Sequence, residues 1–151
     1  MPTPDEDRQS IAALIARQFA SLSWRPGEPA DWAGFGADFH ADARLYPAAR
    51  PIRPQTPADF VARMQELSRT SLQAFEETLL GTEIRVFGNV AVVVAACEAL
   101  ENAAETGGTV EMMLLVREAG AWRIVAQAWD KATPSQPVPE ALLPASGQQP
   151  S

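Results

Sequence analysis

Cysteine, histidine, lysine and tyrosine each occur only once in this chain of 151 residues. The single cysteine excludes an internal disulfide and a zinc site built from cysteines. The longest uninterrupted apolar run, residues 90–97, is far too short to span a membrane. The first ten residues are acidic and lack the pattern of a signal peptide. These absences favour a protein of the reducing cytoplasm that has no membrane partner.

Basic residues are also scarce. Twelve bases stand against nineteen acids, which gives a net charge of −7, and this balance argues against nucleic acid as a partner. Apolar residues make up 46% of the chain and charged residues 21%. That composition is typical of a globular protein and excludes disorder of the whole chain. The length suits one domain.

Helix signals dominate the first half of the chain. Residues 3–6 (TPDE) combine a capping threonine, a proline at the first helical position and a carboxylate three residues after the cap. Apolar residues at helical spacing predict that this helix extends to about Trp24, before a turn at residues 25–27. A second helix is predicted over residues 29–39, and a third begins at Thr56 with the same capping pattern.

The remainder of the chain has the period of strands. A short strand is predicted over residues 43–46, followed by a proline-rich loop. Glycine-containing turns then separate four longer strands, so that consecutive strands form an antiparallel meander. Gly81 indicates a bend or bulge in the first of them. The four predicted strands cover residues 72–87, 90–102, 109–118 and 122–130.

The last nineteen residues contain five prolines and no periodicity. We therefore predict a folded domain over residues 1–132 and an extended or disordered tail over residues 133–151. Only Leu142 and Leu143 offer this tail a means of docking on the domain.

Both faces of the predicted meander are apolar. The turn at residues 119–120 places Arg117 opposite Trp122, and the turn at residues 107–108 places it opposite Glu98. One face then carries Val92, Val94, Leu100, Met113, Leu115, Trp122 and Ile124, and the other carries Val93, Cys97, Met112, Leu114, Val116, Val125 and Trp129. Antiparallel sheets usually expose one face to solvent, and the three predicted helices can cover only one face of this sheet. We therefore expect a homodimer formed through the face bearing Leu100, Met113, Leu115 and Ile124. The alternative is that the sequence is hydrophobic simply because it is rich in strands, and that no partner covers this face.

The element order resembles that of the nuclear transport factor 2-like, or SnoaL-like, superfamily. The resemblance rests on residues 38–43 (DFHADA) before the first strand, on Thr56-Pro57, and on residues 120–124 (GAWRI) entering the last strand. It implies an α+β fold in which a curved antiparallel sheet wraps around the N-terminal helices as a cone, a cystatin-like α+β roll with an internal pocket. It also implies dimers formed through the outer face of the sheet.

The superfamily includes ketosteroid isomerase, which needs a carboxylate base, a tyrosine and a protonated acid. The resemblance places these roles at Tyr46 or Pro47, at Gln18, and at Met112 or Met113. None of these residues can fill its role, which argues against isomerase chemistry. An epoxide-hydrolase site is not evident either, because Arg123 and Asp130 fall on opposite faces of one strand.

Three residues remain as catalytic candidates for a lyase, hydrolase or cyclase: His40, Tyr46 and Glu101. His40 is either a general base oriented by a neighbouring aspartate or a helix-end residue. Glu101 either enters the pocket, where burial would raise its pKa, or is solvated at the end of its strand. Glu98 is expected to form a structural ion pair with Arg117, and Cys97 to be a small core residue. Neither metal-ligand spacing nor a phosphate loop is present, so we expect no metal and no cofactor.

Aromatic residues cluster around the predicted open end of the cone. They either close the space between helices and sheet or form a slot for a ligand, with a few polar groups at its mouth. The predicted ligand-binding residues are Gln18, Trp24, Trp32, Phe35, Phe39, Arg50, Arg53, Met112, Gln127 and Trp129, with Tyr46 at the mouth.

Arg44, Arg50 and Arg53 surround the proline-rich loop. Arginine pairs with carboxylates through two parallel hydrogen bonds. We therefore predict a hydrophobic ligand with a carboxylate or enolate bound by Arg50 or Arg53, unless these arginines neutralise Asp38, Asp42 and Asp59. The leading hypothesis is a small-molecule-binding protein, and an enzyme or a protein interaction module without a ligand are the alternatives.

Overall fold

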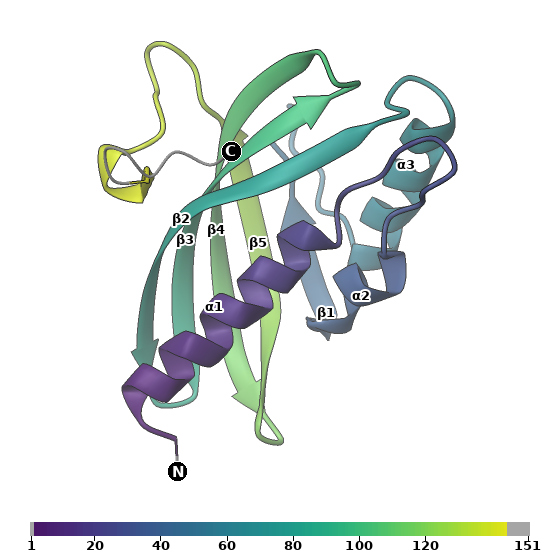
Figure 1. The fold of residues 1–151 in the computed structure, drawn as a ribbon. Coiled ribbons are helices and arrows are strands. Elements are labelled where there is room, and N and C mark those ends of the chain that lie inside the picture. The colour runs from purple at the N-terminus through teal and green to yellow at the C-terminus, as the bar shows by residue number, and fades with distance from the viewer. Residues whose placement is uncertain (1, 145–151) are drawn as a thin grey trace.

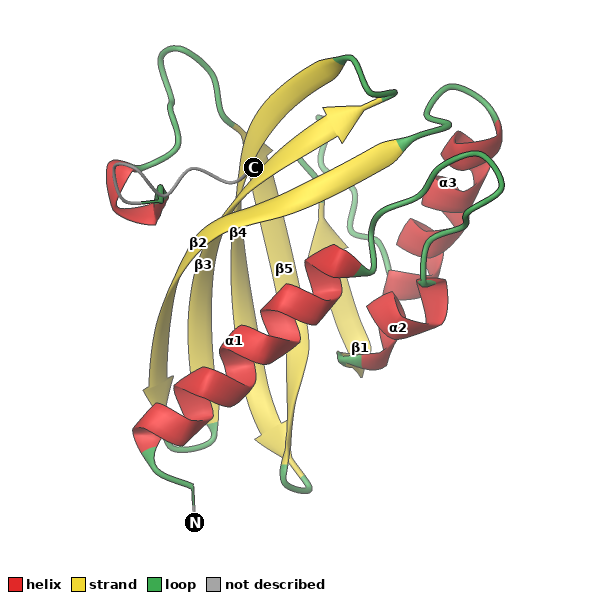
Figure 2. Cartoon of the chain, viewed as in Figure 1, coloured by secondary structure: helices red, strands yellow, loops and turns green. Residues whose placement is uncertain are grey.

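A computed structural model of the chain describes residues 2–144. A long helix crosses a curved five-stranded sheet, and two shorter helices lie at one side of it (Figures 1 and 2). No helix within the described residues is long and apolar enough to cross a membrane. The elements are α1 (Pro4–Ala20), α2 (Trp32–Ala37), β1 (Phe39–Tyr46), α3 (Pro57–Arg69), β2 (Phe75–Phe87), β3 (Val90–Glu101), β4 (Glu105–Glu118), β5 (Ala121–Lys131) and the 3-10 turn η1 (Glu140–Leu142).

The predicted starts of the first and third helices are confirmed, whereas the second helix begins at Trp32 and not at residue 29. Thr3 caps α1 by accepting a hydrogen bond from the Glu6 backbone N–H. At α3, Thr56 and Asp59 cap each other reciprocally, at 3.0 and 3.1 Å. Helix α1 ends at Ala20, before the predicted boundary, because the backbone of Trp24 already pairs with Phe75 of the sheet.

Helix α2 has only six residues, where eleven were predicted. Asp31 caps it by accepting a hydrogen bond from the Gly34 N–H at 2.9 Å. It stops early because Phe39 begins β1 and aligns with Ile124 of β5.

The sheet has the strand order β1-β5-β4-β3-β2. Strands β2 to β5 form the predicted antiparallel meander. Strand β1 adds to its edge in parallel with β5, so the sheet is mixed. The predicted bulge at Gly81 is confirmed, since the register of β2 against β3 shifts between Leu79 and Gly81.

The predicted turn at residues 107–108 is wrong. The chain turns at residues 102–104, where Asn102 and Ala103 adopt φ values of 51° and 57°. Glu98 therefore faces Gly108, and the expected ion pair between Glu98 and Arg117 does not form. The turn at Ala119 is correctly placed and sets Arg117 opposite Trp122.

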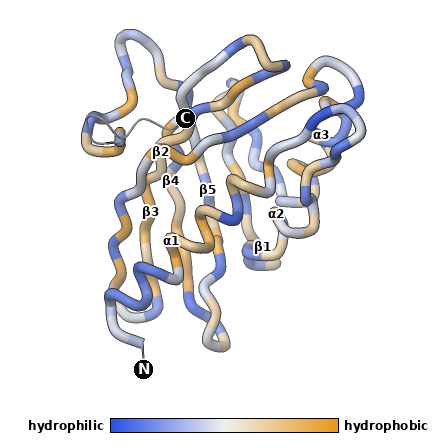
Figure 3. Tube along the Cα trace, in the orientation of Figure 1, coloured by the Kyte–Doolittle hydropathy of each residue, from blue (hydrophilic) through white to orange (hydrophobic). Residues whose placement is uncertain are grey.

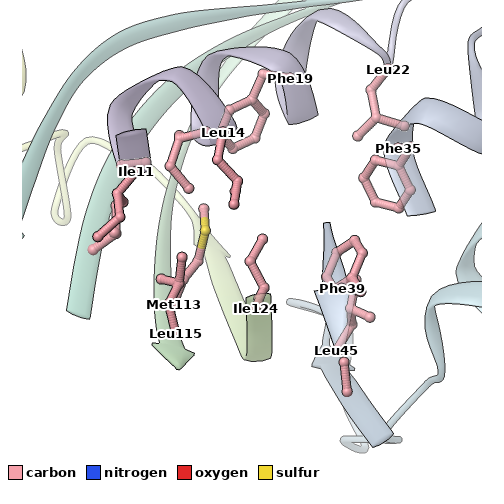
Figure 4. Packing of buried hydrophobic residues seen from close by; sticks show 14 of the residues in the cluster. Ile11, Leu14, Phe19, Leu22, Phe35, Phe39, Leu45, Met113, Leu115 and Ile124 are labelled. Atoms are coloured by element: carbon pink, nitrogen blue, oxygen red, sulfur yellow. The ribbon is translucent and has the colours of Figure 1, made fainter. Parts of the chain in front are cut away.

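This register decides which residues form the core. Met113, Leu115 and Ile124, predicted for a dimer face, are instead buried beneath α1, where Ile11, Leu14 and Phe19 point toward them (Figure 4). Hydrophobic residues run along the central strands of the sheet (Figure 3). Val92 and Met112 lie on the opposite, outer face. The apolar side chains exposed on that face and its adjoining turn are Phe87, Val90, Val92, Met112 and Leu114.

The first part of the C-terminal segment folds back on the sheet. Leu142 is 2% exposed, and its carbonyl lies so close to Gly81 that a Cβ there would be 2.3 Å from the oxygen. Gly108 is covered similarly by Val138 and Ala132. Leu142 thus provides the docking contact that the sequence offered, whereas Leu143 is exposed. Residues 145–151 of the predicted tail lie outside the described residues.

Candidate functional site

A pocket of about 820 Å³ opens between the inner face of the sheet and α3. The sheet contributes side chains from β2, β4 and β5, and the loop that follows β1 forms part of the entrance. Polar lining groups come from the sheet, from the loop after β1 and from α3, and apolar ones from the helices, the loops and the sheet. The lining includes Leu22, Phe35, Phe60, Met64, Leu67, Phe75, Glu77, Ala99, Thr109, Glu111, Gln127 and Trp129.

Two acids on the sheet wall form the centre of the site, and we call Glu77 and Glu111 the acid pair. Glu111 lies on β4 and is only 5% exposed. Glu77 lies on β2, two strands away across β3. One carboxylate oxygen of each acid and the sulfur of Cys97 on β3 lie within 4.8 Å of one another. Strand pairing therefore brings together acids that are 34 positions apart in the chain.

The surroundings favour protonated carboxyls. Burial raises the pKa of Glu111 to about 7, although the hydrogen bonds from Gln127 and Cys97 lower it. Burial, and secondly the charge of Glu111, hold the pKa of Glu77 well above its usual range. Burial likewise raises the pKa of the Cys97 thiol, so that this group stays neutral and donates to Glu111. Two acids this close hold a proton more readily than either does alone.

A buried amide network orients Glu111. The Gln127 Nε2 donates to Glu111 Oε1 at 2.6 Å. Gln127 is held in turn by Gln18 of α1, whose Nε2 donates to Gln127 Oε1 at 2.9 Å. Gln18 and Gln127 are 1% and 3% exposed. Helix α1 thus helps to orient Glu111 through Gln127.

The acid pair with Cys97 also offers three ligand atoms to a cation. One feature of the cluster disfavours that use. The Gln127 amide directs an N–H at Glu111, where it would oppose a cation. The raised pKa values of the two acids favour instead a proton held between the carboxylates.

The predicted aromatic cluster divides into two groups. In the first, Phe60 stacks on Phe35 at 5.2 Å and meets Trp129 edge-on at 5.7 Å, and all three rings line the pocket. In the second, Trp24 packs between Trp32 and Phe75, and its indole N–H donates to the Leu72 carbonyl at 2.7 Å. That group closes the junction between α1 and the sheet, and its two tryptophans do not line the pocket. Phe39 contacts Phe35 but does not itself line the pocket.

The three candidate catalytic residues are not brought together. Glu101 lines the pocket but is exposed at the end of β3. His40 lies on β1 outside the pocket lining, where its Nδ1 accepts the Asp42 backbone N–H and its Nε2 is 3.3 Å from Glu118. Tyr46 is also outside the lining, and Met112 is 59% exposed on the outer face of the sheet.

Arg50 and Arg53 do line the pocket, as do Arg63 of α3 and Lys131 of β5, which the sequence did not single out. The acid pair was not among the predicted site residues either. A signal for Glu111 existed, because it alternates with Met113 and Leu115 and so shares their inward face. Glu77 carries no comparable signal, because its strand mixes polar and apolar residues on both faces.

No protein-family model and no curated protein matches the sequence. Solved structures do match. An NTF2-like protein of unknown function from Pseudomonas putida is 16% identical with a TM-score of 0.70, over 95% of this chain and 100% of that one. A cystatin-like protein of unknown function from Nostoc punctiforme is 16% identical with a TM-score of 0.68, over 91% and 98%. A candidate dehydratase of the NTF2-like family from Streptomyces avermitilis is 12% identical with a TM-score of 0.69, over 87% and 99%.

These similarities establish the fold. The chain has the cystatin-like α+β fold of the NTF2-like proteins, as the sequence resemblance predicted. Identities of this size say nothing about the reaction or the ligand. Those conclusions have to come from the pocket.

Proposed function

We propose that this protein binds a small, largely apolar molecule in the pocket between the sheet and α3. The observation that carries the proposal is a pocket of about 820 Å³ that joins an aromatic wall to two acids. Apolar walls with a few convergent polar groups are typical of small-molecule sites. A cone filled by its own side chains would instead have favoured an interaction module without a ligand.

Two further polar atoms support a ligand that carries hydrogen-bonding groups. Gln55 Oε1 and Thr109 Oγ1 are buried and have no hydrogen-bond partner among the described residues. Both residues line the pocket. A buried polar group without a partner costs about 1–3 kcal/mol, so a ligand that bonds to these atoms gains affinity from them.

Filling the pocket should abolish binding of the neutral fluorescent probe N-phenyl-1-naphthylamine. Ala99 lines the pocket, so the Ala99→Phe variant places a ring where the probe would lie. Ala13→Phe adds the same ring at an exposed position of α1 outside the pocket lining and serves as the matched control. In a fluorescence titration we expect saturable binding by wild type and Ala13→Phe, and a loss of at least tenfold in affinity for Ala99→Phe. Equal affinity in all three proteins would contradict the proposed site.

The acid pair favours proton transfer as a second candidate function. Of the two carboxyls, one holds a proton and can act as a general acid. The other has released its proton and can act as a general base at the same position. The raised pKa of Glu111, about 7, suits that exchange near neutral pH. A lyase or hydrolase function thus depends on Glu77 and Glu111, rather than on His40 or Tyr46. Since a glutamine cannot release a proton, Glu111→Gln separates catalysis from binding.

We also propose that the outer face of the sheet pairs with a second copy of the chain. Phe87 is 86% exposed there and borders a shallow hollow of about 200 Å³ lined by Val90, Val92 and Leu114. A two-fold axis would place the projecting ring of each copy against the hollow of the other, which makes the surface complementary to itself.

Light scattering on the purified protein should then give twice the chain mass of 16.3 kDa. Met112→Glu should give monomers of 16.3 kDa, because it would bury an unpaired charge at the interface. Glu76→Ala, also at an exposed strand position but outside the apolar surface, is the control and should stay dimeric. A wild-type mass of one chain at micromolar concentration would overturn the proposal.

A further inference from the structure

Positive charge is concentrated at the entrance of the pocket. Four of the twelve bases of the chain line it, and we call Arg50, Arg53, Arg63 and Lys131 the cationic rim. They come from the loop after β1, from α3 and from the end of β5, and all four are exposed. Two exposed acids, Glu101 and Asp130, also line the entrance. The rim therefore has an excess of two positive charges, in a chain whose net charge is −7.

The rim cations are not used for neutralising acids of the protein. None of the four forms a salt bridge within the described residues. Arg50 donates to the backbone carbonyls of Pro47, Ala48 and Ala49, at 3.3, 3.0 and 3.2 Å. These neutral partners hold the guanidinium in place and leave its charge uncompensated.

Two of the three acids that were expected to pair with the loop arginines have other partners, and the third, Asp42, forms no salt bridge with them within the described residues. Asp38 lies 3.3 Å from Arg17 and 3.9 Å from Arg123. The Asp59 carboxylate accepts the Thr56 backbone N–H as the cap of α3. The competing explanation, that the loop arginines neutralise nearby aspartates, is therefore not supported by the described contacts.

We propose that the ligand of this pocket is an organic oxyanion: an apolar body with a terminal carboxylate that binds Arg53 and Arg63 at the cationic rim. This inference rests on the proposed function, since it concerns the ligand of the same pocket. The anionic end lies at the rim, because the acid pair would repel it further in. The apolar body lies along Phe60 and Trp129. A carbonyl or hydroxyl at the far end meets the acid pair, which can donate a hydrogen bond to it.

Two probes with the same apolar body test this ligand class. 1-Anilinonaphthalene-8-sulfonate carries an oxyanion, and N-phenyl-1-naphthylamine is the same molecule without it. Arg53→Gln/Arg63→Gln should weaken binding of the sulfonate about tenfold or more, because charge-assisted hydrogen bonds are lost, and leave the neutral probe within about twofold. Arg25→Gln/Arg69→Gln removes the same charge from exposed residues outside the pocket and should change neither affinity. Competition by 2-naphthoate should exceed that by its methyl ester in wild type and in the control variant, and should equal it in the rim variant.

The outcomes separate this inference from the function on which it rests. If the rim variant weakens both probes equally, or if the control variant weakens the sulfonate as much, the rim does not recognise an oxyanion. Equal competition by 2-naphthoate and its ester would overturn the inference in the same way. In each case the proposed function stands if Ala99→Phe still abolishes binding of the neutral probe. If Ala99→Phe leaves that binding intact, the pocket itself is not the site and both proposals fail.

Discussion

Replacing Arg117 by methionine is expected to lower the free energy of unfolding by about 3–5 kcal/mol, because it leaves a buried carboxylate without its partner. The guanidinium NH1 lies 2.5 Å from Asp7 Oδ1, and the two side chains are 12% and 8% exposed. Arg117 also donates to Asn89 Oδ1 and to the Gly88 carbonyl, both at 3.1 Å. It further lies 4.8 Å from the centre of the Trp122 ring. One side chain thus joins the start of α1 to the turn between β2 and β3 and to strand β5.

Urea unfolding at pH 7 measures this effect. Arg123→Met is the matched control, because its side chain is 39% exposed and lies 3.9 Å from Asp38, so that we expect a loss below about 1 kcal/mol. The double variant Asp7→Leu/Arg117→Met removes both buried charges and should recover much of the loss. Equal losses for Arg117→Met and Arg123→Met would show that the Asp7 contact does not stabilise the fold.

Local chemistry explains what was predictable in the fold. The caps at Thr3 and Thr56 are hydrogen bonds within four residues, so the sequence reveals them directly. The bulge at Gly81 was predicted from a glycine within a strand, but its reason is tertiary, because Leu142 packs against it. Gly107 and Gly108 resemble a turn in sequence. Gly108 instead makes room for Val138, which only the folded chain reveals.

That misplaced turn had consequences for the whole sheet. A shift along β3 exchanges the inner and outer faces of a strand, since side chains alternate. Both faces were therefore correctly expected to be apolar, but Met113 and Leu115 were assigned to a dimer face and Met112 to the pocket. The partner of Arg117 was missed for a different reason, because Asp7 is 110 positions away in the chain.

The site was partly predictable. Gln127, Trp129, Arg50 and Arg53 line the pocket, and they were selected from their place relative to strand ends and the proline-rich loop. The acid pair could not be selected in this way. Its members meet only because β2 and β4 flank β3 in the observed register. Long-range pairing, rather than any local pattern, creates the chemistry of the pocket.

Lowering the pH from 8.5 to 5.5 should stabilise the protein, and Glu111→Gln should remove the part of that dependence that Glu111 contributes. The pKa of Glu111 is raised from 4.5 to about 7. The folded state therefore binds a proton that the unfolded state has released, and the resulting stability is lost as the pH rises through 7. This one group contributes about 2 kcal/mol over the interval, since one pKa unit corresponds to about 1.4 kcal/mol. Glu77, whose pKa is also raised, acts in the same direction.

Unfolding free energies in urea at pH 5.5, 7 and 8.5 measure the dependence. A glutamine at position 111 is neutral throughout, still accepts the Gln127 amide, and no longer raises the pKa of Glu77 by its charge. The variant should consequently be more stable than wild type at pH 8.5 and show a flatter profile, in which the contribution of the buried Glu77 remains. Glu98→Gln, an exposed acid on the neighbouring strand, should follow the wild-type profile. Parallel profiles for wild type and Glu111→Gln would show that Glu111 is not the member of the acid pair that takes up the proton in this interval.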